Sequence, residues 1–578
     1  MRVAFLIGCC AGLCPGADST VAGEVRAPSP TLTNLSIEWM IEGDDNLNGS
    51  VNVHYRVVGE RAWRQGMPLR RVPAGEARTT AVPFGWANKH SGSIFDLRPN
   101  TEYEVRLTLS DPDGGSATRM IRARTRPVPR ASPHGVIRRV TPETIARAAA
   151  PGEILLLVAG QYGRFVAPSD GEPGRPIIYR SSDGAAIFDS IVLDGRKHVY
   201  VEGLTIRTQV GAANPRGVGI TLRGCVECVV RRCRIDAVYG IRASSPPGCT
   251  NCYIADNIIE GTTPWTPEAM GANGKNIGEG IELAGSGNVI AFNRVKGFRD
   301  CISTMEDRNA HDQFSIDILN NDIYTGADDA VEADFCLHNC RVMRNRITNS
   351  FVGVSSQPGL GGPTYFIRNV MYNLTYVPFK LHRYSQGDVI LHNTTVKVGD
   401  GMACFAGQPF DFAYFRNNLS IGGPPGGIRW GGYGGGTGLA ANFVSPGPHT
   451  DFDYDAVGTW ETPFAARIGR RDFFDVERHG VRIDMSVFDP QVEFPNPPLP
   501  ERAPPDLRPR RGSKVENAAV RIPNVNDRYL GNGPDIGAYE VSQPLPTYGP
   551  RPEAEDEETV LAALDRASKP IRAERERR

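Results

Sequence analysis

The chain has 578 residues, and 64 Lys and Arg balance 65 Asp and Glu to give a formal net charge of −1. This balance excludes the basic excess that is typical of nucleic-acid-binding proteins. No apolar run reaches the ~18 residues that a membrane-spanning helix needs. The 64 Gly and 45 Pro indicate a turn-rich β protein and are too few for collagen or a low-complexity chain.

The first residues resemble a secretory leader. Met1-Arg2 precedes a short apolar stretch from Val3 to Cys14, and we place the leader at residues 1–17. The run Leu6-Ile7-Gly8-Cys9 resembles a bacterial lipobox, which would acylate Cys9. We expect a secreted or periplasmic protein. A lipoprotein anchored at Cys9 and a misassigned start codon are the alternatives.

Residues 26–127 predict a β-sandwich, because short alternating runs such as 35–39 and 51–55 are separated by turn-forming residues. The segment Leu97-Arg98-Pro99-Asn100-Thr101-Glu102-Tyr103 resembles the Leu-x-Pro-x-Thr-x-Tyr stretch of fibronectin type III domains. The resemblance implies that Tyr103 forms a tyrosine corner and that a Trp fills the core. It implies little about function, because such domains are commonly spacers or binding units.

Residues 254–419 carry an internal repeat, and we place the domain that contains it at residues 133–541. Asparagines recur at intervals that settle to 24 residues, each with an apolar residue three positions before it: Asn257, Asn293, Asn321, Asn345, Asn369, Asn393 and Asn417. A fixed period of short β-runs without intervening helices is typical of a β-solenoid. The fold class that we expect is all-β: a right-handed parallel β-helix with about 24 residues per coil, preceded by the sandwich. Inward asparagines stacked about 4.8 Å apart would hydrogen-bond one another and the turn backbone.

Segments at the ends of the repeat are predicted to close it. Thr141-Pro142-Glu143-Thr144 predicts a helix to about Ala149 that caps the first coil. A second short helix is expected within 462–477. Residues 542–578 predict a charged, mobile tail, with helical character at 556–567.

The opening coils carry a family resemblance. Residues 151–162, followed by Gly174-Arg175-Pro176-Ile177-Ile178-Tyr179-Arg180, resemble the first coils of the pectin-lyase-like superfamily, particularly its chondroitinase B and alginate lyase branch. The resemblance implies a carbohydrate-active enzyme that acts on an acidic polysaccharide. We expect such a protein to be a monomer that binds no nucleic acid.

Four cysteines form two Cys-x-x-Cys pairs, Cys225 with Cys228 and Cys249 with Cys252. Members of the two pairs share offsets from the asparagine anchors, so we expect thiols stacked in successive coils. Disulfides between coils and a zinc site are the alternatives.

Several charged residues stand at equal distances in sequence after the repeat asparagines, which places them on one side of the solenoid. Asp300 and Asp328 share one offset, and Asp329 follows. Glu332, Ser356 and Lys380 share another, while Asp334 and His382 share a third, with Arg383 next. Stacked like charges repel each other, so this cluster predicts a site for a cation, a proton or a substrate. Insertions beside it carry Trp265 and His311, which with Ser356 are candidates for substrate binding.

Three chemistries fit these residues. In a lyase, which the resemblance implies, Lys380 would remove the C5 proton of a uronate, Arg383 or His382 would assist, and Asp328, Asp329, Glu332 and Asp334 would hold Ca²⁺. In a hydrolase or uronate epimerase, carboxyl groups would act as acid and base. In a glycan-binding or adhesion solenoid, the same residues would bind without cleavage.

The hydrolase alternative has its own resemblance. Thr325-Gly326-Ala327-Asp328-Asp329 is similar to the Thr-Gly-Asp-Asp run of polygalacturonases, with Asp300 one coil earlier where they place another catalytic Asp. The Gly-His-Gly of that family has no counterpart, because Val352-Gly353-Val354 stands there. The sequence alone favours the lyase and leaves the other two open.

Overall fold

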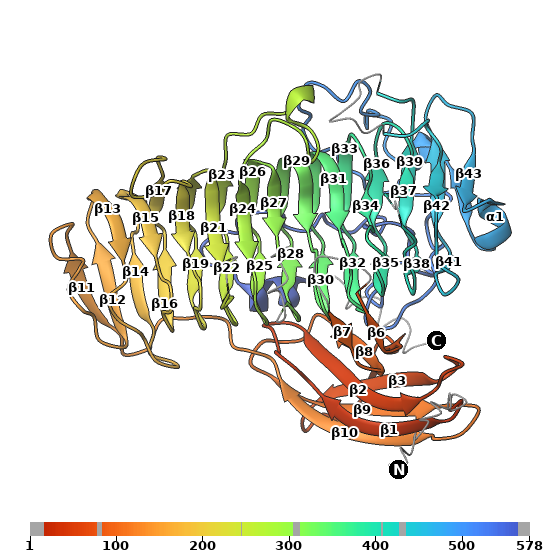
Figure 1. Cartoon of the computed structure of the whole chain (residues 1–578), viewed down its shortest axis with the longest axis horizontal. Helices are drawn as coiled ribbons and strands as arrows, with labels where there is room; N and C mark the ends of the chain where they lie inside the picture. The colour runs from red at the N-terminus through yellow and green to blue at the C-terminus, as the bar shows by residue number, and fades with distance from the viewer. Residues whose placement is uncertain are drawn as a thin grey trace, which may run out of the picture.

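The computed structural model describes residues 17–77, 84–243, 246–304, 313–405, 408–426 and 435–564. The predicted lipidation site Cys9 and the candidate His311 lie outside these residues. The chain is all-β, with 42% of residues in strands and 3% in helices. Antiparallel sheets at the N-terminus precede a β-solenoid of about 12 turns, whose coils stack along one axis (Figure 1).

The N-terminal unit consists of two four-stranded antiparallel sheets and a small hairpin. The first sheet has the order β1 (Thr20–Arg26), β2 (Leu35–Gly43), β8 (Lys89–Ile94), β5 (Arg70–Val72), and the second has the order β10 (Ala117–Arg124), β9 (Glu102–Ser110), β3 (Ser50–Val57), β4 (Arg64–Gln65). The hairpin pairs β6 (Gly75–Glu76) with β7 (Gly85–Trp86). Trp39 is fully buried between the sheets, and the Tyr103 hydroxyl accepts a hydrogen bond from the Arg98 amide at 2.9 Å, as a tyrosine corner requires.

Parallel strands of the solenoid form two long sheets. The 13-stranded sheet contains β11 (Val136–Val140), β12 (Glu153–Leu157), β14 (Ile177–Arg180), β16 (Val199–Glu202), β19 (Val229–Arg231), β22 (Tyr253–Ala255), β25 (Val289–Ala291), β28 (Asp317–Leu319), β30 (Cys340–Met343), β32 (Thr364–Ile367), β35 (Asp388–Leu391), β38 (Tyr414–Arg416) and β41 (Asp451–Asp453).

The other sheet, with 22 strands, bends around the remaining sides of each coil. It contains β13 (Gly160–Val166), β15 (Ala186–Val192), β17 (Thr205–Arg207), β18 (Val218–Thr221), β20 (Arg234–Asp236), β21 (Tyr239–Ala243), β23 (Ile258–Glu260), β24 (Glu279–Leu283), β26 (Arg294–Phe298), β27 (Asp300–Ser303), β29 (Asp322–Glu332), β31 (Arg346–Ser355), β33 (Val370–Leu374), β34 (Phe379–Lys380), β36 (Thr394–Val396), β37 (Met402–Phe405), β39 (Leu419–Gly422), β40 (Ala441–Phe443), β42 (Ala456–Thr459), β43 (Ala466–Ile468), β44 (Arg471–Asp472) and β45 (Val481–Ile483).

The asparagine ladder runs through the coil interior. Each amide nitrogen donates to the Oδ1 of the asparagine one coil on and to a carbonyl one coil back; Asn345, for example, donates to Asn369 Oδ1 at 3.0 Å and to Ile318 O at 2.9 Å. The rung after Asn393 is Asn418, one residue later than predicted. Asn417 instead donates to the ring of His392. The ladder continues on Asp455, which accepts from Asn418, and ends on Glu477, which accepts from the Asp455 amide at 3.2 Å.

Helices are few among the described residues: η1 (Pro267–Ala269), α1 (Phe473–Val476), η2 (Met485–Val487) and a C-terminal helix at 557–564. The helix predicted for 141–149 is absent. Turns replace it because the Ala149 amide bonds to Ser169 Oγ instead of continuing a helix. Ile145 and Ala149 are nevertheless buried in the first coil, so these turns close the end of the solenoid.

The sandwich is fixed against the 13-stranded sheet by a buried polar interface. Arg341 on β30 and Asp317 on β28 form a fully buried ion pair, and Arg341 also donates to the hydroxyls of Ser36 and Ser93 at 3.0 Å. Phe95 packs edge-on against Tyr365, with ring centroids 5.1 Å apart.

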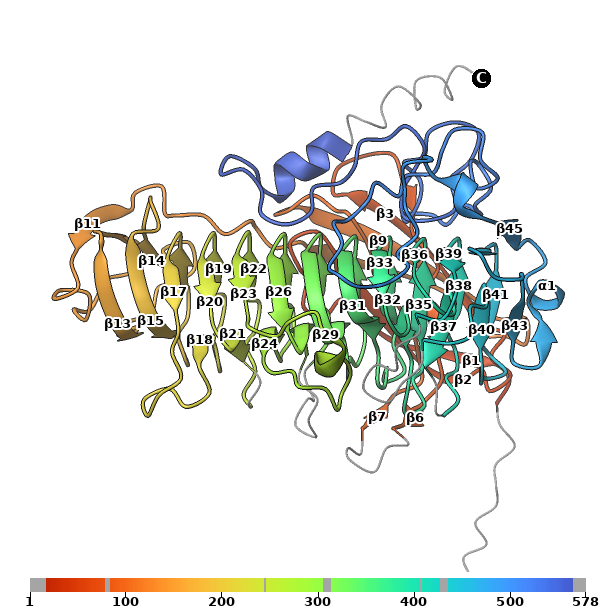
Figure 2. The same cartoon turned by 90° about the horizontal axis from the view of Figure 1, so that it is seen from above.

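Residues after α1 cover another side of the coils. Phe494, Val515, Ile536 and Tyr539 pack on Val370, Leu419 and their neighbours in β33, β36 and β39. In Figure 2 this segment lies along the opposite edge of the coils from β18, β21 and β24. The tail expected to be mobile also packs on the solenoid as far as residue 564. Buried Arg551 pairs with Asp256 at 2.8 Å and lies over the Phe292 ring.

All nine cysteines among the described residues are buried free thiols, as the stacked arrangement predicts, and none of them forms a disulfide. The hydrogen bond with the Cys228 thiol, then burial, raises the pKa of Cys225. Neither of the two clusters of metal-ligating side chains in the described part of the chain contains a cysteine.

Replacing one ladder asparagine should destabilise the solenoid strongly. Asn345→Ala removes the acceptor for the Asn321 amides and two donated bonds, all buried. Since each unsatisfied buried group costs about 1–3 kcal/mol, we expect a loss of about 3 kcal/mol in the free energy of unfolding, measured by urea denaturation. Exposed Asn532→Ala is the control and should change stability little. Equal stabilities of the two variants would contradict a structural role for the ladder.

Candidate functional site

The candidate site lies on the side of the 22-stranded sheet formed by β18, β21, β24, β27, the ends of β29 and β31, β34 and β37. We call this side the open face. One row of paired positions crosses it in the order Thr221, Arg242, Glu282, Ser303, Glu332, Ser355, Lys380. Positions three residues earlier carry Glu279 paired with Asp300, and Asp329 paired with Val352. Stacked coils therefore bring acids from three turns together.

A bulge in β29 brings two consecutive aspartates to this face. Gly326 pairs with Ser350 but Asp329 pairs with Val352, so β29 has one residue more than β31 between these rungs. Adjacent residues of a regular strand point to opposite sides, and a bulge relieves that alternation. Oxygens of Asp300, Asp328 and Asp329 consequently lie within 4.8 Å of one another. Asp300 lies level with Asp329, whose amide donates to it at 2.8 Å, and not with Asp328 as predicted.

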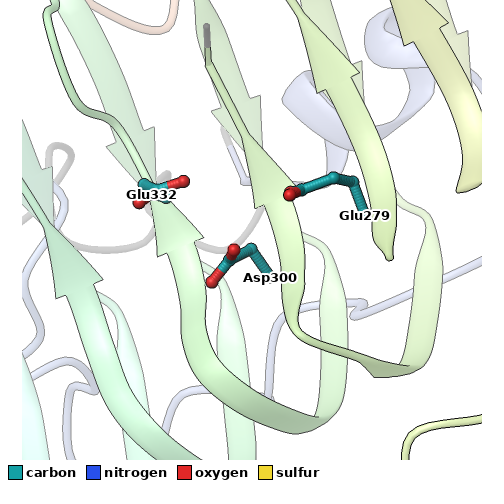
Figure 3. Close-up of side chains that lie close together, drawn as sticks. All are labelled: Glu279, Asp300 and Glu332. Carbon is teal, nitrogen blue, oxygen red and sulfur yellow. The ribbon is translucent and has the colours of Figure 1, made fainter. Parts of the chain in front are cut away.

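Asp300 also belongs to a second cluster of three carboxylate side chains. Figure 3 shows Glu279, Asp300 and Glu332 projecting from neighbouring strands toward one another, and their oxygens also lie within 4.8 Å. Ser303 donates to Glu279 at 2.7 Å. Glu332 is 8% exposed, and none of the hydrogen bonds of the described residues ends on its carboxyl group. This carboxyl group is therefore buried without a hydrogen-bond partner among the described residues.

Two cations face the five carboxyl groups. Lys380 Nζ donates to Asp329 Oδ2 at 2.6 Å, and both side chains are largely buried. Arg299 lies 3.4 Å from Asp300 and 3.5 Å from Asp328. Its side chain is 43% exposed, which makes it the member of the cluster that a ligand meets first. Asp329 Oδ1 is buried and has no hydrogen-bond partner in the structure.

Burial and mutual repulsion raise the pKa values of these carboxyls. Burial, then the charge of Asp329, raises the pKa of Asp328 to about 6. Burial, then Glu282, raises that of Glu279 to about 8. Burial with neighbouring carboxylates also holds the pKa values of Asp300 and Glu332 well above their usual range. For Lys380, burial favours the neutral amine, but Asp329, Asp334 and Glu332 outweigh it and raise the pKa.

The donor set fits a hard cation. Both groups of three offer only carboxylate oxygens, which Ca²⁺ prefers, and Asp329 Oδ1 is an unsatisfied buried acceptor. Of the predicted metal ligands, Asp328 and Asp329 belong to one group and Glu332 to the other. Asp334 belongs to neither, since its Oδ1 accepts from Ser355 Oγ at 2.6 Å and from the Gln357 amide at 2.8 Å.

Other predicted site residues lie apart from the carboxyl cluster. Trp265 is buried against Met270 and Val352 and donates to Pro498 O, so its ring is not presented for sugar stacking. Ser356 is buried and hydrogen-bonded to Ser385, while Ser355 occupies the row between Glu332 and Lys380.

His382 and Arg383 follow Lys380 in a half-buried turn. Burial, with Arg383 and Lys380 nearby, lowers the pKa of His382 to about 4, so this imidazole is neutral at pH 7.

Glu279, Arg299 and Ser355 were missed from the sequence. Glu279 ends the long insertion after Asn257, so its distance from that anchor does not reveal that it pairs with Asp300. Arg299 precedes Asp300 directly, and only the bend of the strand turns it toward the acids.

A scan against protein-family models finds no match, and a search of curated proteins finds none either. No helix in the described part of the chain is long and apolar enough to cross a membrane. The function must therefore be argued from the geometry of the site.

Removing the amine of Lys380 should destabilise the protein through Asp329. Lys380→Met leaves a buried carboxylate without its partner, which typically costs about 3 kcal/mol or more. We expect Asp329→Asn/Lys380→Met to recover most of that loss in urea unfolding, because no unpaired charge remains. Lys296→Met, which breaks an exposed pair with Glu501, should change stability by less than about 1 kcal/mol. Additive losses in the double variant would show that the two residues are not coupled.

Proposed function

We propose that the protein is a carbohydrate-active enzyme that hydrolyses a glycan at the open face, with Asp328 and Asp329 as the acid and the base. The observation that carries the proposal is the convergence of Asp300, Asp328 and Asp329 within 4.8 Å beside Lys380. The similarity of residues 325–329 to the polygalacturonase run supports it. Buried carboxyl groups with displaced pKa values in one site are typical of acid–base catalysis.

Each aspartate has a different role. Asp328, with its raised pKa, donates a proton to the leaving glycosidic oxygen as the C–O bond breaks. Asp329 is held near the charge of Lys380, and its unpartnered Oδ1 accepts a proton from the attacking water. The water oxygen bonds to the sugar carbon, so one water is consumed for each bond cleaved. Oxygens of Asp328 and Asp329 lie within 4.8 Å of each other, closer than the ~6.5–9.5 Å between the carboxyl groups of most inverting glycosidases. Asp300 accepts from the Asp329 amide and fixes the bulge that positions both.

Substrate class follows from charge. If all five carboxyls were ionised, Arg299 and Lys380 would leave three negative charges unbalanced, and these would repel a uronate. Hydrolysis of a uronate-containing polysaccharide therefore requires that some of these carboxyls retain protons, which the raised pKa values of Glu279, Asp300 and Glu332 favour. Ca²⁺ at Asp300, Asp328 and Asp329 would supply positive charge only in place of acid catalysis. The leader-like N-terminus supports action outside the cytoplasm, where such polymers occur.

β-Elimination is the second candidate, favoured by the cation-compatible carboxyls and by Lys380 among them. The structure favours elimination less than the sequence does. Neighbouring carboxylates raise the pKa of Lys380 and keep its amine protonated, whereas a general base must be neutral. A non-catalytic glycan-binding solenoid, with the fibronectin-like sandwich as a spacer, is the third reading.

The assay that separates these functions uses purified protein with pectate, alginate, glycosaminoglycans and neutral polysaccharides, with and without chelator. We expect new reducing ends without the ultraviolet absorbance of an unsaturated uronate, and loss of at least about 10²-fold in kcat for Asp328→Asn. Rising absorbance would establish elimination instead. Retention of polymer without cleavage would establish a binder. Half-buried Asp236→Asn, on β20 outside the cluster, is the matched control and should keep full activity.

The pH dependence tests the role of Asp328. An acid catalyst works only while protonated, so kcat/KM should fall about tenfold per pH unit as pH rises above about 6, the raised pKa of Asp328. An activity that stays constant between pH 6 and pH 8 would exclude Asp328 as the acid.

A further inference from the structure

The two directions away from the carboxyl cluster along the open face differ sharply. Toward the C-terminal coils, the position level with Asp329 is Val352, which is 1% exposed, and beyond it Val377 is 8% exposed. Trp265 and Met270 pack over both valines. Among the described residues, the positions next to the aspartates on this side are therefore buried and leave an incoming polymer no surface to contact.

The insertion that carries Trp265 and Met270 is hydrogen-bonded to β29, the strand that contains Asp328 and Asp329. Gly271, in the long insertion that carries Trp265, donates to Ala327 O at 2.7 Å, directly before Asp328. Trp265 is itself bonded to Pro498 at the C-terminal crossing. In Figure 1 the insertion rises above β26 and η1 lies over β29. The closure is therefore a built part of the fold at the edge of the cluster.

Toward the N-terminal coils the face stays accessible. Tyr239 and Val218, at the start of β21 and β18, are partly exposed, as are Arg242 and Thr221 at their ends. β21 pairs with β24, so Tyr239 lies one coil from Glu279, two from Asp300 and three from Asp329. Three coils correspond to about 15 Å, within reach of a glycan that extends several units from the cleaved bond along the face.

Tyr239 and Arg242 form a unit suited to a sugar. The Arg242 guanidinium lies over the Tyr239 ring at 4.6 Å, and its Nε pairs with Glu282 at 2.6 Å. Aromatic rings pack on the apolar faces of sugars, while guanidinium and carboxylate groups bind hydroxyls and, for Arg, a uronate carboxylate. No part of the acid–base mechanism uses these residues.

We propose that the glycan lies only on the N-terminal side of the carboxyl cluster, so that the enzyme removes units from a chain end, and that Tyr239 and Arg242 bind a unit two or three places from the cleaved bond. The inference rests on the proposed function, since it assigns the mode of action of that site. The blocked direction sets the chain-end mode, and the Tyr–Arg pair sets the distal subsite.

The product pattern tests the chain-end mode. Using the full-length protein and the polymer that it cleaves best, we expect one short product of constant length from the first time points while the viscosity hardly falls. A ladder of mixed lengths with a rapid loss of viscosity would overturn the inference and leave the hydrolase intact. A protein that cleaves no polymer contradicts the proposed function instead.

Binding tests the subsite separately. In the Asp328→Asn background, Tyr239→Ala and Arg242→Gln should each weaken binding of a trisaccharide of that polymer by about three- to tenfold in calorimetry. Arg242→Gln should lose this effect on a carboxyl-reduced trisaccharide. Arg234→Ala, which breaks the Arg234–Glu260 pair on the neighbouring β20, is the matched control. Unchanged affinity in both test variants, with native thermal unfolding, would overturn the subsite.

Discussion

One constraint governs this protein: every coil must stay in register with its neighbours, and the buried asparagine ladder enforces it. A shift by one residue would turn each side chain of a strand to the other face and leave several amide groups unpaired inside the solenoid. The open face inherits this precision, because Glu332, Ser355 and Lys380 come from consecutive coils of the same stack. At the end of the ladder, Asp455 and Glu477 take the places of asparagines. Burial raises the pKa of Asp455 to about 6, and burial with the charge of Asp455 raises that of Glu477 to about 11, so this carboxyl pair retains a proton.

A second constraint acts within the site. Five carboxyl groups are brought together where water is largely excluded, and among the described residues Lys380 and Arg299 pair directly with them. Such an excess is relieved by retained protons or by a bound cation. Protons retained on Asp328 make it an acid, whereas a cation would make the same oxygens ligands. Acid catalysis and cation binding are therefore competing uses of one set of atoms, and the solution pH decides between them.

The period of 24 residues sufficed to predict the solenoid and the proximity of Asp329, Glu332 and Lys380. Counting in steps of 24 residues from Glu332 pointed to Ser356 instead of Ser355. The bulge in β29 makes the step between Glu332 and its partner one residue shorter. It missed Glu279 for a related reason, since an insertion of unknown placement precedes it. Trp265 looked like a sugar platform because composition does not show what covers an aromatic ring. The packing of Arg551 on Asp256 depends on a contact across almost 300 residues that no local pattern encodes.

The covering of the other faces restricts where function can reside. The sandwich seals the Arg341–Asp317 pair with Ser36 and Ser93, so it covers the 13-stranded sheet as an integral part of the structure. The segment after α1 covers β33, β36 and β39 with apolar side chains. In the proposed hydrolase, a long polymer near the carboxyl cluster would follow the open face, because the sandwich and the C-terminal segment cover the other faces of these coils (Figure 1). Trp265 and Met270 would close one direction along that face, so the covering elements would leave the substrate one approach to the cluster.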